Sequence, residues 1–129
     1  MRPPKYAAVR VEDSLWVISA AQSAQSGLDL ASLQGQVSAN NVANGLTNGF
    51  VPSRVDPQTQ SAGGVTGSIQ VLPNAPVEAN INGTLVAFSG TDLIAETVNT
   101  QSALAAYQAN LATLRAQDAD SRVLMSIRS

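Results

Sequence analysis

Residues 26–50 read SGLDLASLQGQVSANNVANGLTNGF, a nearly uncharged helical pattern that enters a cluster of asparagines and stops at a Gly/Thr/Gly/Phe turn. A second long helical pattern, which contains AYQAN at residues 106–110, follows after a short middle. The sequence therefore predicts a mainly α fold. In it, two long terminal helices pair as an antiparallel coiled coil, and a small β-hairpin or irregular segment forms the middle.

Four segments are expected along the chain. They are an N-terminal extension (1–13), an N-terminal helix with its exit turn (14–50), a short β and loop middle (51–90) and a C-terminal helix (91–129). Ser14 is a favourable N-cap for the first helix, which should end near Asn44 with Gly45 as its left-handed C′ residue. The second helix should begin at Asp92 or the residue before it, because the carboxylates of Asp92 and Glu96 match the positive end of a helix.

The middle contains short strand patterns separated by turn residues. Residues 68–72 alternate between apolar and polar, and residues 77–88 alternate on both sides of Asn82-Gly83. Asn-Gly between two alternating runs is the strongest short signal for a β-hairpin. We expect one small hairpin, with up to three strands in all, and a flexible loop over residues 58–67, which have little apolar content.

Both helical patterns carry small or apolar residues at spacings of four and three, the heptad pattern of a coiled-coil seam. In the first helix the seam holds Val17, Ala21, Ala24, Leu28, Ala31, Gly35, Ser38 and Val42, and a second stripe holds Leu30, Leu33 and Val37. In the last helix the seam holds Leu93, Thr97, Thr100, Leu104, Tyr107, Leu111, Leu114, Asp118, Ser121 and Met125, and a second face holds Val98, Ala105, Ala109, Ala112, Ala116, Ala119, Val123 and Ile127. Two stripes on one helix indicate two contacts, one with the chain's own first helix and one with a neighbouring subunit. For the first helix we expect the seam to pack against another chain, because the rest of the chain is too small to cover so long a helix; a single amphipathic core helix with loose heptads is the alternative.

Charged residues make up 12% of the 129 residues, and the net charge is −2 with no block of basic residues. Nucleic-acid binding is therefore not expected, because neutralising phosphates requires clustered Lys and Arg. No apolar run reaches the roughly 20 residues that span a membrane. Aromatic residues are only 4% of the chain, so a core built mainly from Ala, Val and Leu should leave an isolated monomer marginally stable.

The chain has no histidine and no cysteine. It therefore lacks the commonest general base and transition-metal ligand, and it has no thiol chemistry. Its carboxylates fall mostly in local pairs near the expected helix ends, where solvation and the helix dipole explain them. We expect no enzymatic activity, no cofactor, no metal and no small-molecule substrate. The basic residues near the N-terminus are not followed by an apolar stretch, so no cleavable secretory signal is expected.

Two sets of motifs carry a resemblance to a known family. GL at residues 27–28, NNVAN at 40–44 and TNGF at 47–50 resemble the N-terminal signature of flagellar axial proteins, the family of rod, hook and hook-associated proteins. DL at residues 92–93, TVN at 97–99 and AYQAN at 106–110 are similar to the C-terminal signature of that family. The short middle is most similar to that of the small proximal rod proteins, of the rod protein C type.

The resemblance implies a structural subunit of the bacterial flagellar basal-body rod. Members of the family are exported unfolded by the flagellar type III apparatus and polymerise through their terminal helices into a helical tube that transmits torque. The implied partners are copies of the chain, other rod and axial proteins and the export apparatus, and the implied location is the rod that spans the periplasm. Val51-Pro52 stands where the family usually has Lys or Arg after Gly-Phe, which leaves a diverged rod paralogue open. The other alternative is a non-flagellar helical-hairpin adaptor that forms a closed dimer or heterodimer.

The candidate assembly residues lie on the seams and around the asparagine cluster. They are Leu28, Leu33, Val37, Asn40, Asn41, Val42, Asn44, Thr47, Gly49, Phe50, Leu93, Val98, Leu104, Tyr107, Gln108, Asn110, Leu111 and Leu114. The amides of Asn40, Asn41 and Asn44 can cap the helix end, or they can fix the exit of the chain and bond across subunits. Gly49 should supply a positive φ, and Phe50 should anchor the exit against the helices.

Residues of the AYQAN motif have separate expectations. Tyr107 lies on the seam, so its ring should be in the core while its hydroxyl reaches a partner. Gln108 and Asn110 lie off the seam, where subunit contact and plain solvent exposure both fit.

Overall fold

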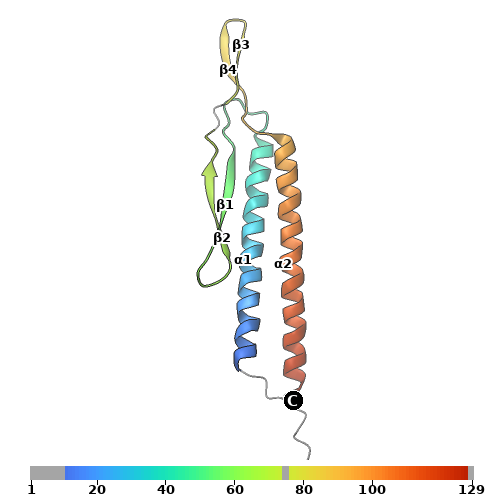
Figure 1. The fold of residues 1–129 in the computed structure, drawn as a ribbon. Coiled ribbons are helices and arrows are strands. Elements are labelled where there is room, and N and C mark those ends of the chain that lie inside the picture. Colours follow the sequence, from blue (N-terminus) through green and yellow to red (C-terminus); the bar gives the residue numbers. More distant parts are fainter. Residues whose placement is uncertain (1–10, 74–75, 128–129) are drawn as a thin grey trace, which may run out of the picture.

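The computed structural model describes residues 11–73 and 76–127, with the backbone alone for residues 11–17, 124 and 127. Two long helices, α1 (Val11–Ala43) and α2 (Leu93–Ile127), lie side by side and run in opposite directions (Figure 1). Between them in the sequence come two antiparallel hairpins, β1 (Ser53–Thr59) with β2 (Val65–Val71) and β3 (Glu78–Ile81) with β4 (Thr84–Ala87). Two long helices with a small β middle are thus confirmed, although the middle holds two hairpins where one was predicted.

α1 begins at Val11, so the N-cap predicted at Ser14 is wrong, and Ser14 lies inside the helix. No glycine or proline stands between Val11 and Ser14, so nothing in the sequence stops the helix from extending upstream. Residues 11–13 of the predicted extension are therefore helical, and residues 1–10 lie outside the described residues.

The end of α1 differs from the prediction in its geometry. α1 ends at Ala43, and Gly45 does not take the left-handed conformation, whereas Gly49 does, with φ at 72°. The backbone tightens instead, because the N–H of Gly45 donates to the carbonyl of Val42 at 3.0 Å. A Cβ on Gly45 would lie 2.9 Å from Leu93 Cδ2. Glycine here leaves room for the Leu93 side chain of α2 and does not supply a positive φ.

α2 begins with the predicted cap. Asp92 Oδ1 accepts the N–H of Ile94 at 2.9 Å and the N–H of Ala95 at 3.1 Å, which satisfies two of the four free donors at the helix start. The start predicted at Asp92 is thus confirmed. Glu96, which was expected to act on the helix dipole, is instead buried and bonded to α1.

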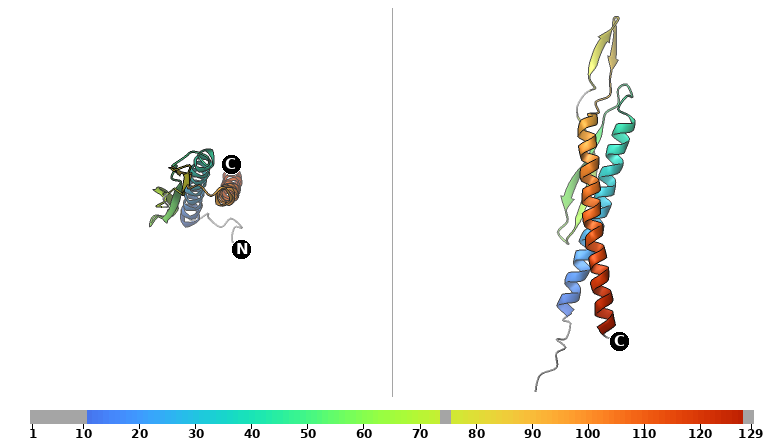
Figure 2. Two further views of the ribbon diagram at one scale, coloured as in Figure 1. Left: turned by 90° about the horizontal axis from the view of Figure 1, so that it is seen from above. Right: turned by 90° about the vertical axis from the view of Figure 1, so that its right-hand side faces the viewer.

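The β1–β2 hairpin packs on α1, and α1 lies between this hairpin and α2 (Figure 2). The strands pair Ser53 with Val71 at one end and Thr59 with Val65 at the other. The flexible loop predicted over residues 58–67 is therefore wrong at both of its ends, which belong to strands. The prediction failed because these strands are supported by the surface of α1, not by apolar alternation of their own.

The β3–β4 hairpin turns at Asn82-Gly83, as predicted. The φ angles are 54° at Asn82 and 84° at Gly83, and both central residues of a type I′ turn require positive values. This hairpin lies beyond the ends of the two helices (Figure 1), and no helix or other strand of the described chain contacts it.

The core of the single chain is small. The buried apolar side chains of the described residues are Ala24, Leu28, Ala31, Pro52 and Ala103, and the buried polar ones are Ser38, Asn41 and Glu96. Much of the apolar surface is left uncovered: Leu46 is 93% exposed, Ile94 is 80% exposed and Leu85 is 69% exposed.

Candidate assembly interface

Asn41 lies where α1, β1 and α2 meet, and it is fully buried. Its Nδ2 donates to the backbone oxygen of Ser53 at 2.6 Å and to Glu96 Oε1 at 2.8 Å, and its Oδ1 accepts the N–H of Ser53 at 3.0 Å. The backbone oxygen of Asn41 also accepts the hydroxyl of Thr91 at 3.2 Å. One residue therefore fixes both the exit of the chain from α1 and its entry into α2. Both Nδ2 hydrogens are used, so the side chain has no donor left for another subunit.

The other two asparagines of the cluster lie at the helix end. Asn44 Nδ2 donates to the backbone oxygen of Asn40 at 3.0 Å, which satisfies one of the free carbonyls of the last turn. Thr47 Oγ1 donates to Asn44 Oδ1 at 3.3 Å. Asn40 and Thr47 are exposed and Asn44 is half-buried, so these residues close the helix and still present surface.

The exit loop is joined to the returning chain by backbone bonds. The N–H of Gly49 donates to the carbonyl of Ala87 at 2.9 Å, and the N–H of Gly90 donates to the carbonyl of Phe50 at 2.9 Å. Phe50 is half-buried at this crossing. Leu46, which the sequence did not single out, is 93% exposed in the same loop and adds an apolar side chain to its outer surface.

The contact between α1 and α2 is partly polar. On α1 the buried side chains are Ala24, Leu28, Ala31 and Ser38, which belong to the predicted seam, and Asn41, which does not. The buried seam residues are covered within the chain, so the expectation that this seam packs on another chain is wrong for them. On α2 the buried residues are Glu96 and Ala103, one heptad apart, and neither belongs to the predicted seam. One heptad further, Asn110 faces Gly27, where a Cβ would lie 2.6 Å from Asn110 Nδ2. Asn110 therefore lies in the helix contact, and its predicted position off the seam is wrong.

The side of α2 that contacts α1 is not the predicted apolar seam. Polar residues lie on the contacting side. The predicted seam consists mainly of apolar residues, whereas Glu96 enters the contact through a hydrogen bond to Asn41 and Asn110 occupies the space above Gly27. The heptad interval that joins Glu96, Ala103 and Asn110 is the one sequence signal that could have revealed this face.

Apart from Ala103, which is buried, and Leu111 and Leu114, which are half-buried, the described apolar side chains of α2 are exposed. Within the described chain, α2 contacts α1 and no other element. The described side chains of its predicted second face, which are all exposed, are Val98, Ala105, Ala109, Ala112, Ala116, Ala119 and Val123. From the predicted seam, Leu93 is 47% exposed and Leu104 is 56% exposed. This outward surface, called here the α2 outer face, is the one that a second chain could cover.

The structure distributes the candidate assembly residues over three classes of burial. The buried ones are Leu28 and Asn41; the half-buried ones are Leu33, Val37, Asn44, Phe50, Asn110, Leu111 and Leu114; the exposed ones are Asn40, Val42, Thr47, Gly49, Leu93, Val98, Leu104, Tyr107 and Gln108. The ring of Tyr107 was predicted in the core, but the residue is 40% exposed. Leu33 is covered by the β1–β2 hairpin, since a Cβ on Gly67 would lie 3.3 Å from Leu33 Cδ2.

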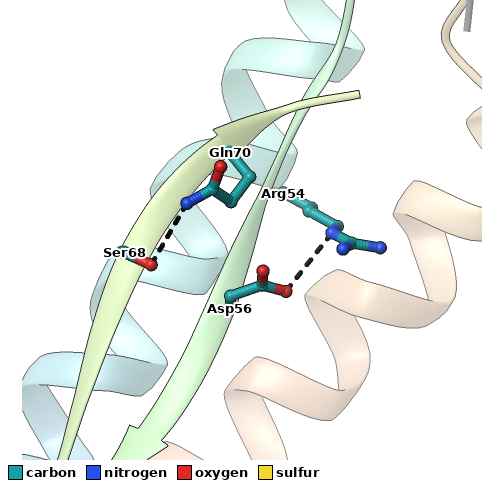
Figure 3. A network of polar contacts seen from close by, with 4 residues as sticks. All are labelled: Arg54, Asp56, Ser68 and Gln70. Carbon is teal, nitrogen blue, oxygen red and sulfur yellow. Dashed lines mark hydrogen bonds and ion pairs between the residues drawn. The ribbon is translucent and has the colours of Figure 1, made fainter. Parts of the chain in front are cut away.

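A cavity of about 290 Å³ adjoins the Asn41 junction, with Glu96 and Asn99 of α2, Ser38 of α1 and Arg54 of β1 in its wall. Glu96 is 6% exposed, and its Oε2 has no hydrogen-bond partner in the chain. The side of the β1–β2 hairpin that carries Arg54 is polar (Figure 3). Arg54 Nε lies 3.3 Å from Asp56 Oδ1, and on the paired strand Gln70 Nε2 donates to Ser68 Oγ at 3.5 Å.

The chemistry available at this cavity is limited. One buried carboxylate among amides and hydroxyls does not form the pair of groups that acid–base hydrolysis uses. The part of the chain that the structure describes holds no group of three or more acidic residues able to bind a metal ion. Neither described helix contains an apolar stretch of membrane-spanning length.

No model of a protein family matches the chain, and no curated protein matches it. Its function must therefore be inferred from the α2 outer face and from the junction around Asn41.

Proposed function

We propose that the chain is a structural subunit of the bacterial flagellar basal-body rod, which polymerises through its terminal helices into a helical tube. The observation that carries this proposal is the α2 outer face, which no element of the described chain covers. The resemblance of residues 27–50 and 92–110 to the two axial signatures supports the flagellar rod as the assembly. The chain contributes no catalytic step to it.

In this proposal the two helices of one chain pair as an antiparallel coiled coil. The buried residues Ala24, Leu28 and Ala31 follow one another at spacings of four and three on α1, which is the interval of a coiled-coil seam. Small side chains on this seam let the helix axes approach closely. The residues of the α2 outer face then point away from α1 and toward neighbouring copies.

Assembly supplies the burial that one chain lacks. Each Å² of apolar surface removed from water contributes about 25 cal/mol, and obligate interfaces commonly bury upwards of 2,000 Å². A chain with so small a core is easy to keep unfolded during type III export and gains stability only among its neighbours. The proposed partners are copies of itself, other rod and axial proteins and the export apparatus, and the proposed location is the rod.

The alternative proposal is a non-flagellar helical-hairpin adaptor or a diverged rod paralogue. The same α2 outer face supports it, because a single partner helix could cover that face. The two proposals differ in geometry: an adaptor forms a closed complex of fixed size, whereas a rod subunit makes contacts that do not close and gives an open helical filament.

Sedimentation velocity of the purified full chain over a wide concentration range tests the assembly. We expect association that grows with concentration without stopping at a dimer. Val98→Lys places a charge on the α2 outer face and should weaken association by at least tenfold, because about 1.4 kcal/mol corresponds to one factor of ten. Gln25→Lys adds the same charge at an exposed polar residue of α1, away from the α2 outer face, and should change association less than threefold. A cooperatively folded monomer at every concentration would contradict the proposal.

Deleting the gene in the organism that encodes the chain tests its place in the flagellum. We expect basal bodies without a complete rod and a loss of swimming, restored by the native chain and not by the Val98→Lys chain. Complete rods in the deletion strain would contradict the flagellar role and leave the adaptor as the remaining proposal.

A further inference from the structure

One carboxylate oxygen at the Asn41 junction has no partner in the described chain. Glu96 is 6% exposed, and its Oε1 accepts a hydrogen from Asn41 Nδ2 at 2.8 Å. Its Oε2 is buried and accepts no hydrogen bond from any described residue. A buried charge is tolerated when it is paired and hydrogen-bonded. This oxygen therefore requires a donor that comes from outside the described chain.

The cavity beside Glu96 has room for such a donor. Its volume is about 290 Å³, far more than the roughly 30 Å³ that one water occupies in the liquid and close to the lower limit of about 300 Å³ for ligand pockets. Glu96 lines the cavity, and the χ3 torsion of glutamate is soft. A small rotation therefore turns Oε2 toward the cavity while Oε1 stays near Asn41. The size fits a group as large as a side chain better than a single bare ion.

The wall of the cavity is rich in hydrogen-bond acceptors. Besides Glu96 it carries three serine hydroxyls and two side-chain amides, all of which can accept a hydrogen bond. An ammonium group directs three N–H donors at separate oxygens, whereas a guanidinium is best matched by both oxygens of one carboxylate. Only one oxygen of Glu96 is free, so the site favours an ammonium group. The other polar residues of the wall with acceptor oxygens are Ser38, Ser53, Ser102, Gln34 and Asn99.

The charges around the cavity leave one negative charge unbalanced. Arg54 lies in the wall, but its Nε is 3.3 Å from Asp56 Oδ1, so these two opposite charges offset each other (Figure 3). The carboxylate of Glu96 has no such partner, and a single positive charge balances it. A divalent metal ion is a poorer match, because the described residues hold no group of three or more acidic side chains that could bind it.

We propose that this cavity binds a primary ammonium group, which donates to Glu96 Oε2 and to hydroxyl and amide oxygens of the wall. A free alkylamine and an amine of a neighbouring chain, on a lysine side chain or at an N-terminus, offer the same chemistry. The site goes beyond the proposed assembly, because all of its walls belong to one chain. Amine binding is therefore tested on the chain itself, and its failure leaves the proposed function standing.

NMR of isotope-labelled glutamate carboxyl carbons tests the site in the full chain. The chain has three glutamates, Glu12, Glu78 and Glu96. The Glu96→Gln variant keeps an oxygen that can accept from Asn41, and it identifies the Glu96 signal by its loss. Propylammonium chloride, added at constant ionic strength and neutral pH, should shift that signal until it saturates in the millimolar range, while the signal of exposed Glu78 stays in place. Tetramethylammonium, which carries the charge but no N–H donor, should give less than a fifth of the shift.

Matched variants separate binding from a structural role, with affinity measured from the backbone amide signals of the cavity wall. Glu96→Gln should abolish saturable propylammonium binding, whereas Glu78→Gln removes an exposed carboxylate and should leave it intact. Ser38→Ala removes one hydroxyl from the wall and should weaken binding at least fourfold. Ser32→Ala, at an exposed serine of the same helix, should change it less than twofold.

Sedimentation of the chain with saturating propylammonium distinguishes the two sources of the ammonium group. If an amine of a neighbouring chain occupies the cavity, the free amine competes with it by mass action and weakens association at least threefold relative to tetramethylammonium. If the ligand is a free amine, association is the same in both salts. Either result supports the site.

Three results would overturn the site. A Glu96 signal that propylammonium does not shift would mean that the cavity holds water alone. An equal shift with tetramethylammonium would mean that any cation acts there through its charge. A shift of the Glu96 signal in Arg54→Gln before any amine is added would mean that Arg54 is already the partner of this carboxylate.

Discussion

Asn41 shows why an asparagine, a poor helix former, stands near the end of α1. Its amide meets both backbone groups of Ser53 at 2.6 and 3.0 Å, in the way that a paired strand would, and its remaining hydrogen goes to Glu96. Aspartate would lack both donors, and glutamine would be one methylene too long for these distances. The junction therefore requires both the amide group and the length of asparagine, and a polar side chain of another kind would not replace it.

Asn41→Ala leaves the N–H of Ser53 and Oε1 of Glu96 without their partner. A buried polar group left unpaired costs about 1–3 kcal/mol, so we expect a loss of roughly 3 kcal/mol. The melting midpoint of the helical circular-dichroism signal should fall by about 10 °C at fixed protein concentration. Asn40→Ala changes an exposed neighbour and should shift the midpoint by less than about 2 °C. Equal effects of the two variants would contradict the role given to Asn41.

The sequence could show that asparagines end this helix, but not which of them is buried. Nothing in the motif distinguishes Asn40, Asn41 and Asn44 from one another. Their different roles become clear only when the hydrogen-bond partners of Asn41 are known. Those partners are Ser53, Thr91 and Glu96, which lie in a segment predicted as irregular and at a helix start assigned to dipole matching. Residue roles that depend on such distant contacts cannot be read from local patterns.

At the scale of the elements, two glycines of α1 have opposite surroundings. A Cβ on Gly27 would lie 2.6 Å from both terminal atoms of the Asn110 side chain, whereas a Cβ on Gly35 would have no atom within 4 Å. Gly27 therefore permits the approach of α1 to α2. Gly35 leaves an open place on the helix that nothing in the described chain fills.

We expect Gly27→Ala to destabilise the helix pair by about 1–2 kcal/mol, because Asn110 must move or the helices must separate. In an Asn110→Ala background the clash is absent, and the same substitution should stabilise by up to about 1 kcal/mol through helix propensity. Thermal unfolding of the four chains of this cycle measures the coupling. Gly35→Ala serves as the control and should be stabilising in both backgrounds. Additive effects of Gly27→Ala and Asn110→Ala would mean that the two residues do not touch.

The β1–β2 hairpin depends on a similar close approach. A Cβ on Gly67 would lie 2.6 Å from Val55 Cγ1 and 2.7 Å from Leu30 Cδ1, so Gly67→Ala should cost about 1–3 kcal/mol of overpacking. Hydrogen exchange should show the loss in β1 and β2, while the amides of β3 and β4 keep their native rates. Uniform changes across both hairpins would contradict a local role for Gly67.

The two hairpins also differ in how far the sequence could reveal them. Asn82-Gly83 between alternating runs fixes a turn type by itself, and β3–β4 was found. β1 contains Pro57, which argues against a strand in most settings, and few apolar residues mark it. It forms because α1 offers Leu30 and Leu33 to the chain that leaves it, and a prediction from local pattern has no access to that surface.

At the scale of the whole molecule, the three layers are unequally covered. α1 is packed on one side by the β1–β2 hairpin and on the other by α2, whereas α2 contacts α1 alone. The sequence anticipated this imbalance, because two apolar stripes on the last helix exceed what one neighbour can cover. The sequence could not predict which side of α2 faces α1, because that side carries the polar residues Glu96 and Asn110 and is neither of the two apolar stripes.

Because the outer face of α2 is uncovered in a single chain, the stability of the fold should depend on the protein concentration. A species that binds the folded chain and not the unfolded one stabilises the fold by mass action, and in this protein that species is another copy. We expect the helical signal and its melting midpoint to rise together as protein concentration increases a hundredfold, by several degrees and without a plateau at dimer stoichiometry. The Val98→Lys chain should keep the low midpoint of the dilute native chain throughout, and the Gln25→Lys chain, with its added charge on α1, should follow the native curve. A midpoint independent of concentration, with cooperative unfolding at the lowest concentration, would show that α1, α2 and the β1–β2 hairpin are stable alone and that the α2 outer face needs no cover.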